Sequence, residues 1–161
     1  MAQKLHPNIE CLRWIVGKWE SFEVSGQYPT VKDFNFRETI DFESIGQPLI
    51  NYSSIARNYE TGAPMHLERG FLKIKPNTNE AALIASQNSG ISTIEEGSVE
   101  EKVLSLETSS ICRPSFAKQP FVTKFQRKYW LEEDVLNYEQ HMETENTPLQ
   151  KHLFVKYRRI E

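Results

Sequence analysis

The chain has 161 residues, which is enough for one domain with a sizeable core. Its net charge of −3 is mild, and this argues against nucleic acid or an acidic membrane surface as the main partner. The apolar fraction of 39% is typical of a folded globular protein, and no apolar run approaches the roughly 18 residues that cross a bilayer.

Cellular compartment and domain count follow from composition along the chain. Residues 1–7 lack the apolar segment of a secretory signal peptide, so we expect a cytoplasmic protein. A reducing compartment would keep Cys11 and Cys112 as free thiols. No repeat, linker or change in composition divides the chain, so residues 1–161 are predicted to form a single domain.

The first predicted element is a short N-terminal helix of about two turns that ends at Gly17. Trp19 follows at once, and we expect it to cap the bottom of the fold with its indole N–H bonded to backbone. The apolar positions that recur at helical spacing are Ile9, Leu12, Ile15 and Val16.

Strands are predicted throughout the rest of the chain. Residues 34–43 alternate between apolar and polar side chains, which is typical of a strand with one buried face. A further strand is predicted at residues 18–24. Weaker alternating runs follow at 48–58, 65–75, 80–87, 90–96, 101–112, 121–132, 134–144 and 150–160, so about ten strands are predicted in all. Hairpin turns are predicted between them, among others at Asn88-Ser89-Gly90 and Glu96-Gly97-Ser98.

This succession predicts an all-β fold, a ten-stranded antiparallel up-and-down β-barrel of the lipocalin or fatty-acid-binding type. Closing the meander removes its two unpaired edges. Ten strands make a wider barrel than eight, so an internal cavity should remain, with the N-terminal helix across one mouth. A β-sandwich is the competing architecture.

Two polar features interrupt the apolar faces. Glu38 shares its parity with Phe34 and Phe36, and a carboxylate that faces a core is costly unless it is paired. We expect either an internal polar residue, bonded to a basic residue or a Trp, or a bulge in the strand. A structural anchor is favoured over a catalytic role for this carboxylate. His66 and Glu68 share one face of the strand at 65–75, either as a surface pair or as part of a site.

His152 stands in the middle of the last predicted strand. An imidazole there can ligate haem iron or can be an ordinary hydrogen-bonded wall residue. The pattern alone places it outside the barrel, unless this strand is covered on both faces. The apolar residues of the opposite parity are Leu149, Leu153, Val155 and Tyr157. His6 and His141 are predicted to be surface residues, and no nucleophile motif, phosphate-binding loop or persuasive carboxylate pair is present.

Taken in order, these segments resemble the nitrobindin family of haem-binding ten-stranded barrels. The resemblance covers the chain from about Asn8 to Ile160. Within this family, the chain is similar to the C-terminal barrel domain of an animal THAP-type zinc-finger protein. Two glycines that many family members carry after G-x-W are replaced by Ser21 and Glu23. The motifs that carry the resemblance are Gly17-x-Trp19, Tyr28-Pro29-Thr30, Gly46-Gln47-Pro48, Pro64-Met65-His66, Glu68-x-Gly70-Phe71, Ser115-Phe116-Ala117-Lys118 and His152-Leu153.

The resemblance implies a ferric haem b protein that binds nitric oxide and isomerises peroxynitrite to nitrate. His152 matches the axial ligand of the haem iron and Thr30 matches a residue that contacts haem, while Met65 and His66 match the distal pocket. The resemblance implies no catalytic side chain, because the haem iron carries the chemistry. It implies no nucleic-acid or membrane partner, and a homodimer is possible. Lys128 is a candidate partner for a haem propionate.

The alternative function is a non-enzymatic carrier of a small apolar ligand such as a fatty acid. The same cavity would then hold the ligand without haem. Glu38 and basic partners inside the barrel would grip its carboxylate head group.

Overall fold

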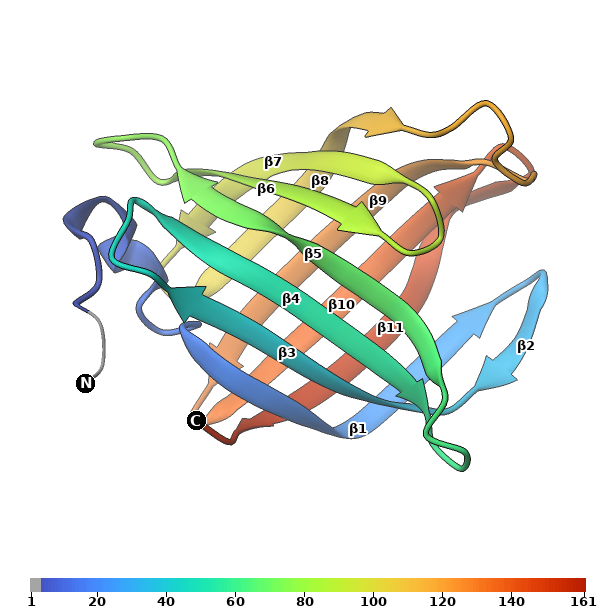
Figure 1. The fold of residues 1–161 in the computed structure, drawn as a ribbon, viewed down its shortest axis with the longest axis horizontal. Helices are drawn as coiled ribbons and strands as arrows, with labels where there is room; N and C mark the ends of the chain where they lie inside the picture. The colour runs from blue at the N-terminus through green and yellow to red at the C-terminus, as the bar shows by residue number, and fades with distance from the viewer. Residues whose placement is uncertain (1–3) are drawn as a thin grey trace.

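A computed structural model of the chain describes residues 4–161. Within them it has one short 3-10 helix and eleven strands, which wrap into a barrel (Figure 1). In chain order these are η1 (Pro7–Leu12), β1 (Gly17–Tyr28), β2 (Val31–Phe34), β3 (Phe36–Ser44), β4 (Leu49–Asn58), β5 (Pro64–Ile74), β6 (Glu80–Gln87), β7 (Ser92–Glu100), β8 (Val103–Cys112), β9 (Val122–Glu132), β10 (Val135–Thr144) and β11 (Thr147–Arg159).

The strands form an antiparallel meander that closes on itself. Each strand from β3 to β10 pairs with the next in sequence, and β1 pairs with β11 to close the sheet. The first residues of β1 pair with β3 and its last residues pair with β2. Since only Asn35 separates β2 from β3, these two strands share one position in the wall. The barrel therefore has ten strand positions, which confirms the predicted architecture against a β-sandwich.

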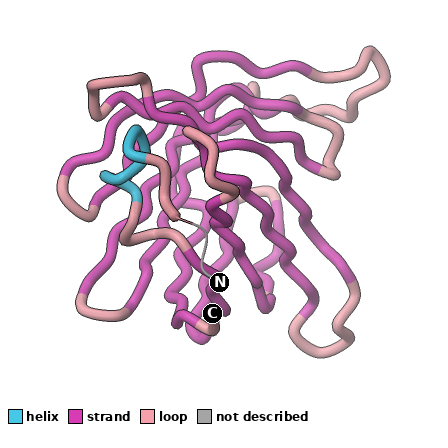
Figure 2. Tube along the Cα trace, turned by 60° about the vertical axis from the view of Figure 1, so that its left-hand side comes forward, coloured by secondary structure: helices cyan, strands magenta, loops and turns pink. Residues whose placement is uncertain are grey.

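The end of the barrel near the N-terminus is closed by η1 (Figure 2). Ile9, Leu12 and Ile15 are fully buried there, and the indole N–H of Trp19 donates to the carbonyl of Ile15 at 2.9 Å. The predicted helix is present, but it is a 3-10 helix and ends at Leu12. A spacing of three residues between these apolar positions matches its three residues per turn. The cap that we predicted for Trp19 is confirmed.

The predicted turn at Glu96-Gly97-Ser98 is wrong, because these residues lie inside β7. The chain reverses at Glu101 instead, which has a φ of 53°. Gly97 has a different role, since a Cβ at this position would lie 1.8 Å from the carbonyl oxygen of Ser105 in β8. The absence of a side chain permits a close approach between β7 and β8, which is a common reason for glycine inside a strand.

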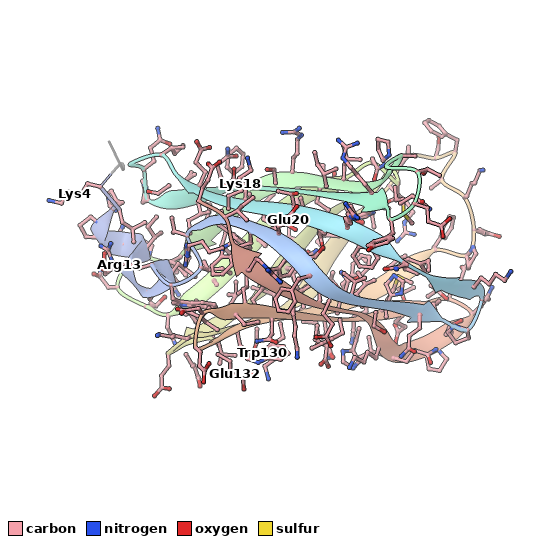
Figure 3. The ribbon with its side chains drawn as sticks, turned by 90° about the horizontal axis from the view of Figure 1, so that it is seen from below. Lys4, Arg13, Lys18, Glu20, Trp130 and Glu132 are labelled. Carbon is pink, nitrogen blue, oxygen red and sulfur yellow. The ribbon has the colours of Figure 1, made fainter. Side chains whose placement is uncertain are left out.

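The lumen is filled unevenly along its length. Apolar side chains from most strands pack with η1 into one core at the closed end, where Leu72, Leu104 and Leu136 are almost fully buried. Lys4 and Arg13 lie on the outside of this end (Figure 3). Among residues 4–161, none of the helical segments has the length and apolar character that a bilayer-crossing helix requires.

Candidate functional site

A cavity of about 310 Å³ occupies the end of the barrel opposite η1. Its lining comes from β2, β3, β4, β5, β6, β9, β10 and β11 and from the turn after β6. The end of β4, the start of β5 and the end of β10 mark this end of the barrel, on the right in Figure 1. The volume falls at the lower end of the range for small-molecule pockets. Much of the lining is apolar and includes Phe34, Phe36, Ile91, Val122, Phe125 and Leu153.

His152 lines this cavity, because the strand that carries it is bulged. In the pairing between β10 and β11, Gln140 lies opposite Leu153 but His141 lies opposite Lys151. His152 is therefore the extra residue of a β-bulge, and a bulge redirects a side chain that strict alternation would turn outward. His152 and Leu153 both face the cavity although they are neighbours in sequence.

The ring of His152 is held by a backbone hydrogen bond. Its Nδ1 lies 2.9 Å from the carbonyl oxygen of Gln27 in β1, and because a carbonyl can only accept, Nδ1 carries the proton. Burial lowers the pKa of His152, although the Gln27 carbonyl opposes this shift. The imidazole is therefore neutral at pH 7, and its lone pair is on Nε2. Tyr28 packs edge-on against the ring, with centroids 5.3 Å apart.

The other residues matched by the resemblance lie at the same end of the barrel. Met65 and His66 line the cavity from β5, across from His152. Thr30 lies in the turn between β1 and β2, where it is exposed and is not part of the cavity lining. The structure thus brings together three of the four predicted site residues and leaves the fourth on the rim.

Glu38 is an internal polar anchor, as predicted, but its partners are hydroxyl groups. Ser54 and Tyr157 both donate to its carboxylate, the latter at 2.6 Å, and Glu38 also borders the cavity. Burial raises the pKa of this carboxyl, although the two hydroxyl groups oppose the shift. No bulge interrupts the pairing of β3 with β4 at this point.

A second polar cluster, which the sequence analysis missed, lies in the lumen around Arg127. Its guanidinium donates to Glu68 at 2.9 Å and to Glu95 at 3.0 Å. Tyr52 donates to Glu68 at 2.9 Å, and Thr93 donates to Glu95 at 3.0 Å. Every member is buried, and Glu68 reaches the wall of the cavity. We call Arg127, Glu68 and Glu95 the lumen charge cluster.

The charges in this cluster stabilise one another. Burial alone would raise the pKa of Glu68, but the charge of Arg127 and the hydrogen bonds that its guanidinium donates outweigh burial and hold that pKa well below its usual range. Burial alone would lower the pKa of Arg127, but Glu68 and Glu95 hold it well above its usual range. The guanidinium and the Glu68 carboxylate are therefore ionised at neutral pH.

The alternation of residues in β9 and β7 contained a signal for this cluster. Arg127 shares its parity with the buried Phe125 and Tyr129, just as Glu38 shares its parity with phenylalanines. Glu95 likewise shares its parity with the buried Thr93. The same test of a charge among apolar residues of one parity that singled out Glu38 would have found Arg127, but not Glu95, whose neighbours at that parity are Thr93 and Gly97.

The cluster bears on the fatty-acid alternative. That hypothesis needs a basic side chain in the lumen that is available for a carboxylate. Arg127 is 1% exposed, and its guanidinium already donates to two carboxylates. A third carboxylate in the cavity would face Glu68 and Glu38 in its wall, which makes an anionic apolar ligand unfavourable there.

Lys128 is not placed for a propionate in the cavity. It is exposed on the outer face of β9, where its ammonium lies 5.2 Å from the ring centroid of Trp130. Trp130 and Glu132 project from the same outer wall in Figure 3. His141 also lies on the outside, with Nδ1 3.6 Å from a carboxylate oxygen of Glu139. His6 caps η1 by accepting from the N–H of Asn8.

The donor set of the cavity suits haem. A neutral imidazole offers Nε2 from the wall of a largely apolar pocket, and its other nitrogen is oriented by a backbone carbonyl. This is the usual arrangement of a metal-ligating histidine, in which the second nitrogen donates to a fixed acceptor. Met65 and His66, which are also ligand types for haem iron, line the same cavity from β5.

Comparison with known proteins agrees with this geometry. A family model described as "THAP4-like, heme-binding beta-barrel domain" matches residues 8–159. The chain is 38% identical to human "Peroxynitrite isomerase THAP4" over 98% of its own length, although it spans only 28% of that protein. It is 34% identical to "Peroxynitrite isomerase 2" of Mycobacterium marinum over 99% of both chains. Rv2717c from M. tuberculosis has a similar structure, with a TM-score of 0.87, 32% identity, and coverage of 98% of this chain and 100% of that one.

Proposed function

The chain belongs to the family of THAP4-like, heme-binding β-barrel domains, and on that premise we propose that it holds ferric haem b through His152 and isomerises peroxynitrite to nitrate. The names of its relatives supply the reaction, and the cavity supplies the place for it. Nitric oxide, a small diatomic ligand of haem iron, is included in the proposal. A homodimer, a cytoplasmic location and a single domain over residues 1–161 stay predictions.

The observation that carries the proposal is the hydrogen bond from His152 Nδ1 to the Gln27 carbonyl at 2.9 Å. It fixes the tautomer that presents Nε2 as a lone pair, and it fixes the direction of the ring. Burial keeps the imidazole neutral at pH 7, so no proton has to leave before a metal is bound.

The protein contributes positioning and shielding, whereas bound haem supplies a Lewis-acidic iron for nitric oxide or a peroxynitrite oxygen. His152 would hold the haem iron through Nε2. Met65 and His66 would border the opposite side, where His66 is held 3.9 Å from Glu68 and could hydrogen-bond an anionic ligand. Thr30 would contact the edge of the haem at the rim. The apolar wall around Phe36 and Phe125 limits the access of water to this space.

Spectroscopy with haemin tests the ligand assignment directly. We expect the purified chain to develop a sharp Soret band with one equivalent of haemin, and His152→Ala to weaken haemin binding at least tenfold. His141→Ala is the matched control, because it removes an imidazole from the outer wall, and it should bind haemin like the parent. An unchanged band in His152→Ala would disprove ligation by His152.

A second measurement addresses the reaction. Stopped-flow mixing of the haem-loaded chain with peroxynitrite should give nitrate at a rate proportional to the haem-loaded fraction. His66→Ala should keep the Soret band and lower this rate, because the change leaves His152 in place. A haem-loaded chain that leaves peroxynitrite decay and the nitrate yield unchanged would refute the isomerase assignment and leave haem binding standing.

A further inference from the structure

The lumen charge cluster carries more negative than positive charge. One guanidinium is set against two carboxylates, so Arg127, Glu68 and Glu95 together leave one negative charge in the interior. Glu38 adds a second negative charge whenever it is ionised. Such an excess is costly in a buried site, because two carboxylates share a single counter-charge away from water.

The cluster lies directly behind the haem pocket. Glu68 belongs both to the cluster and to the cavity wall, and Glu95 lies on the far side of the guanidinium with 0% exposure. Little water is available to screen these charges, so their field reaches into the cavity more strongly than that of a surface charge would.

A ferric porphyrin core carries one net positive charge, whereas a ferrous core carries none. A fixed negative charge nearby therefore favours the ferric form, which balances it, over the ferrous form, which leaves it unbalanced. The excess would be partly compensated only after ferric haem enters the pocket.

We infer that the carboxylate excess of the lumen charge cluster holds a bound haem in the ferric state by lowering its reduction potential. The inference rests on the proposed function, because it concerns haem in the same cavity. Glu68 and Glu95 are positioning residues in this sense, since they act on the iron through their field and are not proposed to touch it.

Other ionisable groups face the same space and have to be controlled. Glu38 borders the cavity from β3, His66 borders it from β5, and His152 is the ligand itself. Tyr52, Tyr129 and Tyr138 lie against Arg127, and Tyr157 donates to Glu38. Burial raises the pKa of all four phenols, so they stay neutral. At pH 8 ordinary imidazoles are neutral as well, which leaves the carboxylates as the charges that vary between variants.

The test is a spectroelectrochemical titration of the haem-loaded chain at pH 8. Glu95→Gln removes one buried negative charge without entering the cavity lining. A unit charge at about 10 Å and an effective dielectric constant of about 20 changes a one-electron equilibrium by roughly tenfold. We expect the ferrous-to-ferric ratio at a fixed potential to rise by that factor, which is about 59 mV for a one-electron couple.

Two matched controls isolate the charge. Glu96→Gln removes the same charge from the neighbouring residue, whose side chain is exposed on the outer face of β7, and should leave the potential unchanged. Thr93→Val removes the hydroxyl that donates to Glu95 but keeps every charge, so it should shift the potential much less than Glu95→Gln. Glu68→Gln also removes one negative charge from the cluster, and it replaces Glu95→Gln in the titration if that variant does not fold.

The outcomes separate the two proposals. A Soret band in every variant, with higher potentials in Glu95→Gln and Glu68→Gln than in Glu96→Gln, supports the inference. Potentials that agree across all of these variants overturn it and leave the haem assignment intact. The absence of a Soret band in the parent chain would refute the proposed function and, with it, this inference.

Discussion

The two ends of this barrel are built from the same strands but are filled in different ways. At the closed end, η1 inserts Ile9 and Leu12 between the walls, and both side chains are fully buried in the apolar core. At the open end no such insert is present among the described residues, and a cavity of about 310 Å³ remains. The same alternation of inward side chains thus gives a core at the end where η1 is inserted and a ligand pocket at the end without it.

The lumen charge cluster lies between these two ends. It borders the apolar core on one side through Tyr129, which packs against Phe42 with ring centroids 5.5 Å apart. It borders the cavity on the other side through Glu68. Buried ion pairs seldom add net stability compared with apolar residues, so a cluster at this boundary is better explained by what it does to the pocket.

The largest expected effect comes from removing the positive charge of the lumen charge cluster. Arg127→Met should lower the free energy of unfolding by roughly 3–5 kcal/mol, because it leaves Glu68 and Glu95 buried without a counter-charge. Urea unfolding followed by far-UV circular dichroism measures this. Lys128→Met is the matched control, since it removes an exposed cation from the next residue and should stay within about 0.5 kcal/mol of the parent.

The two ends should respond differently to the same truncation. Leu12→Ala should cost roughly 2–5 kcal/mol, because Leu12 is fully buried in the packed end and its removal leaves a void. Leu153→Ala should cost less than half as much, since one side of Leu153 already borders the cavity. Equal losses of unfolding free energy would show that the open end is as tightly packed as the closed one.

The smallest expected effect is a pH dependence that arises from Glu38. Burial raises the pKa of Glu38 in the folded chain, so above the ordinary glutamate value of about 4.3 the native state binds more protons than the unfolded state. The free energy of unfolding attributable to Glu38 therefore falls as the pH rises through this window. The Glu38→Gln variant has no ionisable group at this position, so its free energy of unfolding does not fall for this reason.

The matching measurement compares urea unfolding of the parent chain and Glu38→Gln at pH 4.5 and 7.5. We expect the stability of the variant relative to the parent to increase from the lower to the higher pH. Effects of Glu68 and His152 are common to both chains and cancel in the difference. A relative stability that stays constant, or falls, with pH would contradict the raised pKa of Glu38.

Much of the site could be predicted from sequence, but its geometry could not. The resemblance directed attention to His152, Met65 and His66, whereas the alternation in the last strand placed His152 outside. The bulge that turns it inward depends on the pairing of β11 with β10, and a single strand does not reveal its partner's register. The Gln27 carbonyl that orients the ring comes from β1, 125 residues away in sequence.

The sequence by itself determined the barrel. Period-two alternation and frequent turn residues specify ten short antiparallel strand positions, and closure follows from the cost of unpaired edges. Only the tertiary structure decided which charges meet inside. Arg127, Glu68 and Glu95 come from three different strands, β9, β5 and β7, and they pair only because closing the cylinder brings opposite walls within hydrogen-bond distance. Local pattern fixes the direction of a side chain along one strand, but contacts across a lumen depend on curvature and register summed over the whole sheet.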